Sequence, residues 1–142
     1  MDNQEQQATG ELPKGVSLGA RYLASAALGI VLFLFYGWRF LPYSERERHE
    51  PNWWVYLALM VAAGYLLTMG LRRKRFRVCH VLLLTLCLAN AVLITIDCSE
   101  DPTNHNLMPF EFVMIALATL PAYAGAGIGA LVERVTRGRG GD

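Results

Sequence analysis

Four long apolar segments, joined by short polar ones, constrain the fold of this chain more than any other feature. The segments cover roughly residues 22–41, 53–71, 78–96 and 112–132. Each has about the ~20 residues that a helix needs to cross the ~30 Å hydrocarbon core of a bilayer. Backbone groups find no water in lipid, so helices are the expected structure. Their expected bounds are about 20–41, 53–71, 78–96 and 110–132.

The composition fits an integral membrane protein. Hydrophobic residues make up 54% of the chain and charged residues 18%, and the formal net charge of +1 gives no bulk basicity of the kind that binds nucleic acid. We expect a disordered polar tail over 1–15, a transmembrane domain over 16–135 and a short basic and glycine-rich tail over 136–142. Short connections favour an all-α, antiparallel up-down bundle of four transmembrane helices.

Lys and Arg residues are distributed unevenly between the two expected sides of the membrane. The side that holds both termini and the second loop has ten of them, against three on the other side. Five form one cluster, Arg72, Arg73, Lys74, Arg75 and Arg77. The positive-inside rule therefore predicts that both termini are cytoplasmic and that loops 42–52 and 97–109 are extracytoplasmic, in the plasma membrane, or the inner membrane if the host is bacterial. The cluster is interpreted as a topology determinant, with binding of anionic lipid headgroups as a compatible second role.

Small residues indicate where the helices contact one another, because helices in lipid associate through close packing. A helical wheel places four small residues of the last segment on one face. These are Ala118, Ala122, Gly125 and Gly129. Asn90 lies near the middle of the third segment, and its amide is expected to find a partner on another helix.

The outward segment 97–111 carries the highest density of chemically active side chains. Glu111 shares the small-residue face of the last helix, so we expect its carboxylate to point into the bundle. Candidate catalytic residues are Glu111, His105 and Asp101. Candidate ligands for a divalent metal are His105, Asp97, Asp101, Glu111 and His49. No metal-ligand spacing motif supports that set, and a structured turn with Glu111 at the positive end of the last helix is the favoured interpretation.

The three cysteines, Cys79, Cys87 and Cys98, lie along one helix and are too far apart to pair with one another. A thiol-redox enzyme is excluded because the chain has no C-x-x-C motif. Cys98 lies just outside the third segment, on the outward side. It is the candidate for an intermolecular disulfide.

The sequence favours a non-enzymatic protein that acts by association in the bilayer, either with itself or as an accessory subunit of a membrane complex. No cofactor and no nucleic acid partner is expected. One alternative is a metal-dependent or acid/base membrane enzyme, or a ligand sensor, with a site on loop 97–111. Another is an oligomeric channel lined by Asn90 with Thr85 or Thr95.

Overall fold

The structure is a computed structural model that describes residues 16–36, 45, 48, 52–71, 74–100 and 108–138. Within these ranges the chain is helical and contains no strand. The elements are α1 (Leu18–Val31), the π-helical segment η2 (Leu32–Tyr36), α3 (Trp53–Thr68), α4 (Arg75–Glu100) and α5 (Met108–Gly138). Since η2 continues α1 directly, these elements form four helical rods. The expected count of four apolar helices fits the part of the chain that the structure describes.

Three of these rods are long and apolar enough to cross a membrane: Leu18–Tyr36, Arg75–Ser99 and Pro109–Thr136. The fourth, α3, has only 16 residues. Compared with the expected bounds, α4 and α5 extend further at both ends and α3 ends earlier, whereas residues 37–41 of the first expected helix lie outside the described residues. The expected tail 1–15, the last residues 139–142, and most of loops 42–52 and 97–109 lie outside the described residues.

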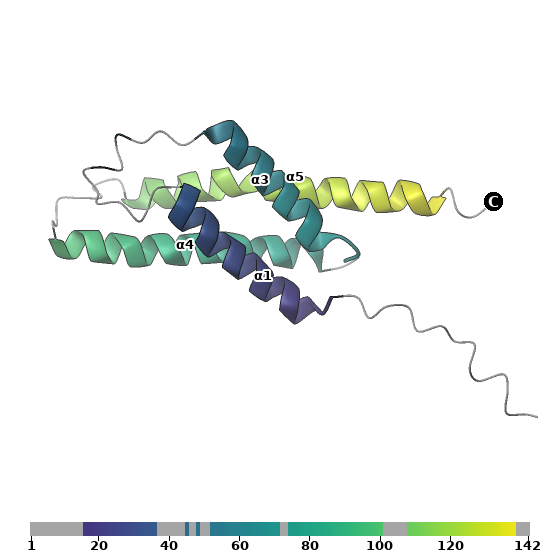
Figure 1. Ribbon diagram of the computed structural model, residues 1–142, viewed down its shortest axis with the longest axis horizontal. Helices are drawn as coiled ribbons and strands as arrows, with labels where there is room; N and C mark the ends of the chain where they lie inside the picture. The colour runs from purple at the N-terminus through teal and green to yellow at the C-terminus, as the bar shows by residue number, and fades with distance from the viewer. Residues whose placement is uncertain are drawn as a thin grey trace, which may run out of the picture.

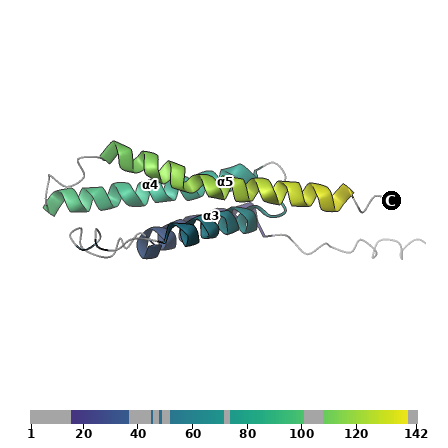
Figure 2. The same cartoon turned by 90° about the horizontal axis from the view of Figure 1, so that it is seen from above.

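The four rods form two layers, with α1 and α3 in one layer and α4 and α5 in the other (Figure 2). Consecutive rods run in opposite directions, and the first layer crosses the second obliquely (Figure 1). Helix α1 packs chiefly against α4, and α3 packs chiefly against α5. Neighbours along the chain are therefore not the main packing partners in the first half of the fold.

Two glycines allow α3 and α5 to approach at the level of their backbones. A Cβ on Gly64 would lie 1.8 Å from the carbonyl oxygen of Ala122, and a Cβ on Gly125 would lie 2.0 Å from that of Val61. Both distances are far below van der Waals contact, so only glycine fits at either position. This is the close packing that small residues permit between helices in lipid.

The contact between α1 and α4 combines a small residue with a hydrogen bond. The Ser25 hydroxyl donates to the carbonyl oxygen of Val78 at 2.9 Å, and Ser25 is fully buried. One turn further along, Gly29 lies against Thr85 and Leu82. A serine and a glycine four residues apart thus give α1 a narrow face on which α4 packs.

The core lies where the two layers cross, and it is small. Its buried members are Leu32, Tyr56, Met60, Leu82, Leu86 and Ala122. Large apolar side chains remain exposed on the outer faces, among them Leu84, Leu88, Val92 and Ile96, which recur every four residues along α4. Such a continuous apolar stripe suits contact with lipid rather than with water.

Polar side chains form hydrogen bonds between the helices at the end of the bundle where α1 begins and α5 ends. The Arg21 guanidinium donates to the carbonyl oxygens of Leu67 and Met69, at 2.9 and 2.5 Å, and so satisfies acceptors at the C-terminus of α3. Gly70 has a positive φ of 79° and donates its N–H to the Glu133 carboxylate at 2.5 Å. The same carboxylate accepts from Arg75 at 3.3 Å. The turn between α3 and α4 is thereby tied to α1 and to α5.

Candidate functional site

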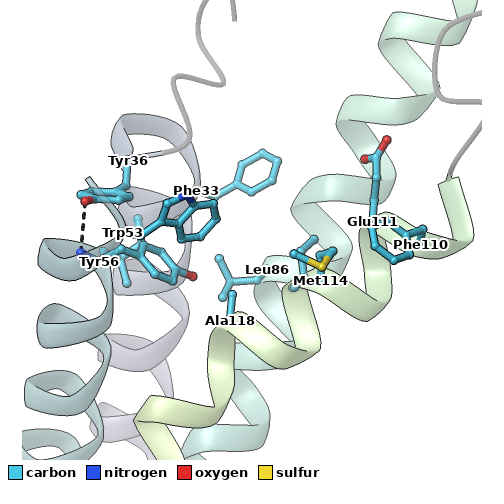
Figure 3. A pocket seen from close by; sticks show the side chains of 11 residues that line it. Phe33, Tyr36, Trp53, Tyr56, Leu86, Phe110, Glu111, Met114 and Ala118 are labelled. Atoms are coloured by element: carbon cyan, nitrogen blue, oxygen red, sulfur yellow. Dashed lines mark hydrogen bonds between the residues drawn. The ribbon is translucent and has the colours of Figure 1, made fainter. Parts of the chain in front are cut away.

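A pocket of about 210 Å³ lies at the other end of the bundle, between η2, α3, α4 and α5 (Figure 3). Most of the side chains that line it are apolar or aromatic. They are Leu32, Phe33, Tyr36, Trp53, Tyr56, Leu86, Phe110, Met114, Ile115 and Ala118, together with Glu111. Its volume is below the range of about 300–1,000 Å³ typical of ligand sites, so any occupant must be small.

One side of the pocket is a cluster of aromatic rings. The rings of Tyr36 and Tyr56 lie 5.1 Å apart, and the Trp53 ring meets that of Tyr56 edge-on at 5.9 Å. The Tyr36 hydroxyl accepts a hydrogen bond from the backbone N–H of Tyr56 at 3.1 Å, as the dashed line in Figure 3 marks. This bond joins the end of η2 to the first turn of α3 and holds the Tyr36 ring in place.

Local sequence explains why these rings face the pocket. Asn52 caps α3, since its side-chain oxygen accepts from the N–H of Val55 at 3.3 Å, and Trp53 and Tyr56 therefore stand in the first turn. In η2 the helix widens to π-helical geometry over Leu32–Tyr36, and Leu32, Phe33 and Tyr36 all line the pocket. Such π-helical turns inside α-helices are frequent at functional sites.

The other side of the pocket carries a carboxylate. Glu111 is in the first turn of α5, where the positive end of the helix dipole favours an anion. Its Oε2 accepts a hydrogen bond from the Asn90 side-chain amide of α4 at 3.1 Å. Asn90 is fully buried, and its Oδ1 has no hydrogen-bond partner among the described residues. The expected partner of Asn90 on another helix is thus Glu111.

Asp97 and Cys98 lie further along α4, towards the same end. Asp97 is 6% exposed, and it is seven residues from Asn90, so both lie on the face of α4 that is turned inward. Cys98 is half-buried. No group of three or more His, Cys, Asp or Glu side chains that could hold a metal occurs in the part of the chain described here. The candidates His49, Asp101 and His105 lie outside that part.

The four small residues of the expected contact face lie at or near the interface between α3 and α5. Ala122 and Gly125 are in backbone contact with α3, and Gly129 lies against the Tyr65 ring, with its Cβ position 3.5 Å from that ring. Ala118 is partly buried and lines the pocket. This packing is within one chain, so the face is already occupied.

The residues suggested for a channel do not line a common path in the single chain. The Thr85 and Thr95 hydroxyls each donate to a carbonyl of their own helix, at 2.8 Å in both cases. Thr85 packs against Gly29, whereas Thr95 is exposed. Asn90 instead points to Glu111.

The basic cluster between α3 and α4 divides into residues with different environments. Lys74 and Arg77 are exposed, and Arg72 and Arg73 lie outside the described residues. Arg75 begins α4 and is only 7% exposed. Besides its contact with Glu133, its guanidinium donates to the carbonyl oxygen of Ala126 at 3.3 Å.

Sequence patterns did not indicate the pocket or the ion pair of Arg75 and Glu133. A run of basic residues is expected in a solvated loop, and Glu133 follows the last apolar segment with nothing to mark it as a partner. Aromatic residues near both ends of the first connection were the available signal for the pocket, because Tyr36, Trp53 and Tyr56 flank it closely in sequence. The same residues also fit an interfacial aromatic belt, so the pattern did not separate the two.

Comparisons of this chain with protein-family models, with curated proteins and with solved structures find no match.

Proposed function

We propose that this chain is a multi-pass membrane protein that holds a small lipophilic molecule in the pocket between η2, α3, α4 and α5. The observation that carries the proposal is the pocket itself, an apolar and aromatic cavity with a carboxylate at one side. Small-molecule sites are typically apolar cavities in which a few polar groups fix the orientation of the ligand. Binding rather than catalysis is proposed, as in the ligand-sensor hypothesis above.

The proposal includes an orientation in the membrane. Both ends of the chain and the segment between α3 and α4 lie in the cytoplasm, and loops 42–52 and 97–109 face outward from the plasma membrane, or from the inner membrane of a bacterium. The excess of Lys and Arg on the cytoplasmic side supports it. The alternating directions of the helices are compatible with it (Figure 1). The pocket then lies towards the extracytoplasmic side.

The surroundings of the pocket support entry from the bilayer. Trp53, Phe110 and Met114 line it and are also 54%, 57% and 43% exposed. Side chains that line the pocket and are also exposed on the outer surface of the bundle indicate where the pocket opens to that surface. In an apolar outer surface, such an opening faces lipid tails, so a lipophilic ligand reaches it without crossing water.

Association with a second copy or with another membrane protein is the second candidate function. The small residues that suggested it are occupied within the chain, but the length of α3 favours it independently. Its 16 residues span about 24 Å at ~1.5 Å per residue, which is less than the ~30 Å hydrocarbon core. A helix that is too short for the bilayer is accommodated by local thinning or by oligomerisation.

Native mass spectrometry on protein extracted from its own membranes in mild detergent tests both candidates. The binding proposal expects a 15.8 kDa monomer with a small non-covalent adduct. Met114→Trp, which fills the pocket from its rim, should remove the adduct. Leu117→Trp is the matched control, because Leu117 is exposed on the same helix and does not line the pocket.

Two results would count against ligand binding. One is an adduct that persists in Met114→Trp, which would place the bound molecule elsewhere. The other is a mass equal to a multiple of the chain, or to the chain plus another protein, with no small adduct. That second result would favour association, and its loss under reductant would assign the link to Cys98.

A further inference from the structure

The aromatic side of the pocket holds a buried hydroxyl that has no hydrogen-bond partner. Tyr56 lines the pocket and is only 9% exposed. Its backbone N–H bonds to the Tyr36 hydroxyl and its ring packs against two others, but its own hydroxyl makes no hydrogen bond among the described residues. A buried polar group without a partner is costly. A partner for this hydroxyl must therefore come from inside the pocket.

The direction of the Tyr56 side chain agrees with this reading. In Figure 3 its oxygen stands on the side of the ring towards Leu86 and Ala118, both of which line the pocket. The bond between the Tyr36 hydroxyl and the backbone of α3 lies on the opposite side. The hydroxyl of Tyr56 is thus presented to an occupant rather than to its own helix.

The polar groups on this side of the pocket are donors. The phenol oxygen of Tyr56 shares lone-pair density with its ring, so it donates better than it accepts. The Tyr36 oxygen already accepts a bond, which leaves its proton to give, and the Trp53 indole N–H is a donor alone. At the other end, the Glu111 carboxylate is already engaged by the Asn90 amide. The aromatic side therefore favours a ligand that brings an acceptor.

The rest of the pocket wall limits what else that ligand carries. Apart from Glu111 and the aromatic group, the lining side chains are aliphatic, phenyl or thioether groups. A ligand O–H or N–H against such a wall would itself be left without a partner. A carbonyl oxygen accepts a hydrogen bond and brings no donor of its own. Aromatic rings beside it suit packing against an apolar body.

We propose that the pocket binds a small lipophilic carbonyl compound, whose oxygen accepts a hydrogen bond from the Tyr56 hydroxyl. Its apolar body packs against Tyr36 and Trp53. This inference rests on the proposed function, since it assigns a ligand class to that same pocket. Free ketones and the ester groups of membrane lipids share this chemistry, and hydrocarbons and organic cations are the competing occupants.

Three probes with one carbon skeleton separate the occupants: 4-phenyl-2-butanone, its alkene isostere (3-methyl-3-butenyl)benzene, and 4-phenyl-2-butanamine. Each is measured by equilibrium dialysis against the full chain in nanodiscs of ether-linked phospholipid, which has no ester carbonyl to compete. Empty nanodiscs are subtracted to remove partition into lipid. The ketone should bind about fivefold more tightly than the alkene, the range of a hydrogen bond between neutral groups. The amine should bind least.

Two tyrosines of α3 provide the matched variants. Tyr56→Phe removes only the hydroxyl, so the ketone should fall to the affinity of the alkene while the alkene changes little. Tyr65→Phe makes the same change at a residue that does not line the pocket, and it should leave the ketone preference intact. The infrared carbonyl stretch of the bound ketone should lie at lower frequency than in empty nanodiscs, and Tyr56→Phe should reverse that shift.

Nanodiscs of ester-linked phospholipid distinguish the two carbonyl sources. A ketone that keeps its affinity there supports a free small molecule as the occupant. A ketone that is displaced there, with a phospholipid mass as the adduct in native mass spectrometry, supports a lipid ester at the same hydroxyl.

The possible failures are distinct. Equal binding of ketone and alkene, lost in Met114→Trp, would overturn the carbonyl inference and leave the ligand-binding function standing. Tightest binding of the amine, or a ketone preference that survives Tyr56→Phe, would also overturn the inference alone. Binding of no probe above the empty nanodiscs would overturn the inference, and the absence of any adduct in native mass spectrometry would then overturn the proposed function as well.

Discussion

Arg75 is the residue whose environment departs most from its sequence context. It belongs to a run of basic residues, yet its guanidinium is buried and contacts the Glu133 carboxylate and the Ala126 carbonyl on α5. A buried guanidinium that donates both to a carboxylate and to a backbone carbonyl oxygen contributes more to stability than an exposed ion pair does.

Arg75→Met should therefore lower the free energy of unfolding by about 1–3 kcal/mol. Arg77→Met, two residues further on and exposed, should change it by less than about 0.5 kcal/mol. Both are measured by unfolding in mixed micelles with increasing denaturing detergent. Equal effects of the two variants would contradict a stabilising contact between the Arg75 guanidinium and α5. Recovery of part of the loss in Arg75→Met with Glu133→Leu would support it.

The pair of Asn90 and Glu111 gives a second prediction at the scale of residues. A double-mutant cycle with Asn90→Ala and Glu111→Ala should show a coupling of about 0.5–2 kcal/mol, the range found for hydrogen bonds between membrane helices. Thr95→Ala replaces Asn90→Ala in the control cycle. The Thr95 hydroxyl bonds to its own helix and should show no coupling to Glu111. A coupling of equal size in the control cycle would argue against a specific bond.

Sequence reasoning at this scale succeeded where a side chain has few options. An amide in the middle of an apolar helix must find a partner, so a contact for Asn90 was predictable, although the identity of that partner was not. Arg75 had options, because a guanidinium can lie in headgroups, in water or against another helix. Which of these it takes depends on where Glu133 lies, and that is set by the packing of α5 rather than by local sequence.

At the scale of elements, the contact between α3 and α5 depends on glycine. Gly125→Ala would place its Cβ against the backbone of Val61, which cannot rotate away as a side chain can. The two helices would have to separate, and we expect a loss of about 1–3 kcal/mol in the same unfolding experiment, as for other overpacked sites.

Gly127 provides the control on the same helix, since nothing lies within 4 Å of its Cβ position. Gly127→Ala should be neutral or should stabilise the protein by up to about 1 kcal/mol, because alanine is the better helix former. If Gly127→Ala destabilises the protein as much as Gly125→Ala does, the close contact of Gly125 with the α3 backbone is not the cause of the loss.

The elements themselves followed from apolar length and spacing, but the pocket between them did not. The small residues Ala122 and Gly125 predicted a contact face on the last helix. Two helices can approach closely only where side chains are small, whichever helix is the partner. The π-helical turn at Leu32–Tyr36 has no comparable pattern in the sequence. Phe33 and Tyr36 lie in this turn and line the pocket, so the shape of the pocket depends on a local geometry that composition does not encode.

At the scale of the whole molecule, the proposed orientation can be tested through Cys98. Cys98 is near the end of α4 that should face outward, whereas Cys79 is buried and Cys87 lies mid-helix. After treatment with an impermeant reductant, a small sulfonated maleimide should label Cys98 in intact cells. Cys98→Ser should abolish that labelling.

Lys74→Cys in the Cys98→Ser background is the matched probe of the opposite end, where Lys74 is exposed. It should react only after the cells are permeabilised. Labelling of position 74 but not of Cys98 in intact cells would reverse the orientation. Labelling of both would contradict a bundle that spans the bilayer.

The relative placement of the helices was the part of the fold that sequence could not supply. The distribution of Lys and Arg predicts which side of the membrane each helix end faces, and helix lengths predict which segments span it. Neither predicts which helices are in contact. The oblique crossing of the two layers, with α1 on α4 and α3 on α5, is set by where glycine and serine permit close approach (Figure 2). Several pairings of four apolar rods satisfy the same apolar pattern.

This crossed pairing has a consequence for biosynthesis. A ribosome releases the helices in chain order, so α1 emerges well before its partner α4, and α3 emerges before its partner α5. Neither early helix has its glycine or serine contact until the second half of the chain is made. In a nascent chain that stops before α5, Gly64 of α3 has no helix to pack against. Quality-control proteases would then have access to an unassembled α3. Completion of the last helix is thus the event that commits the whole chain to its native arrangement.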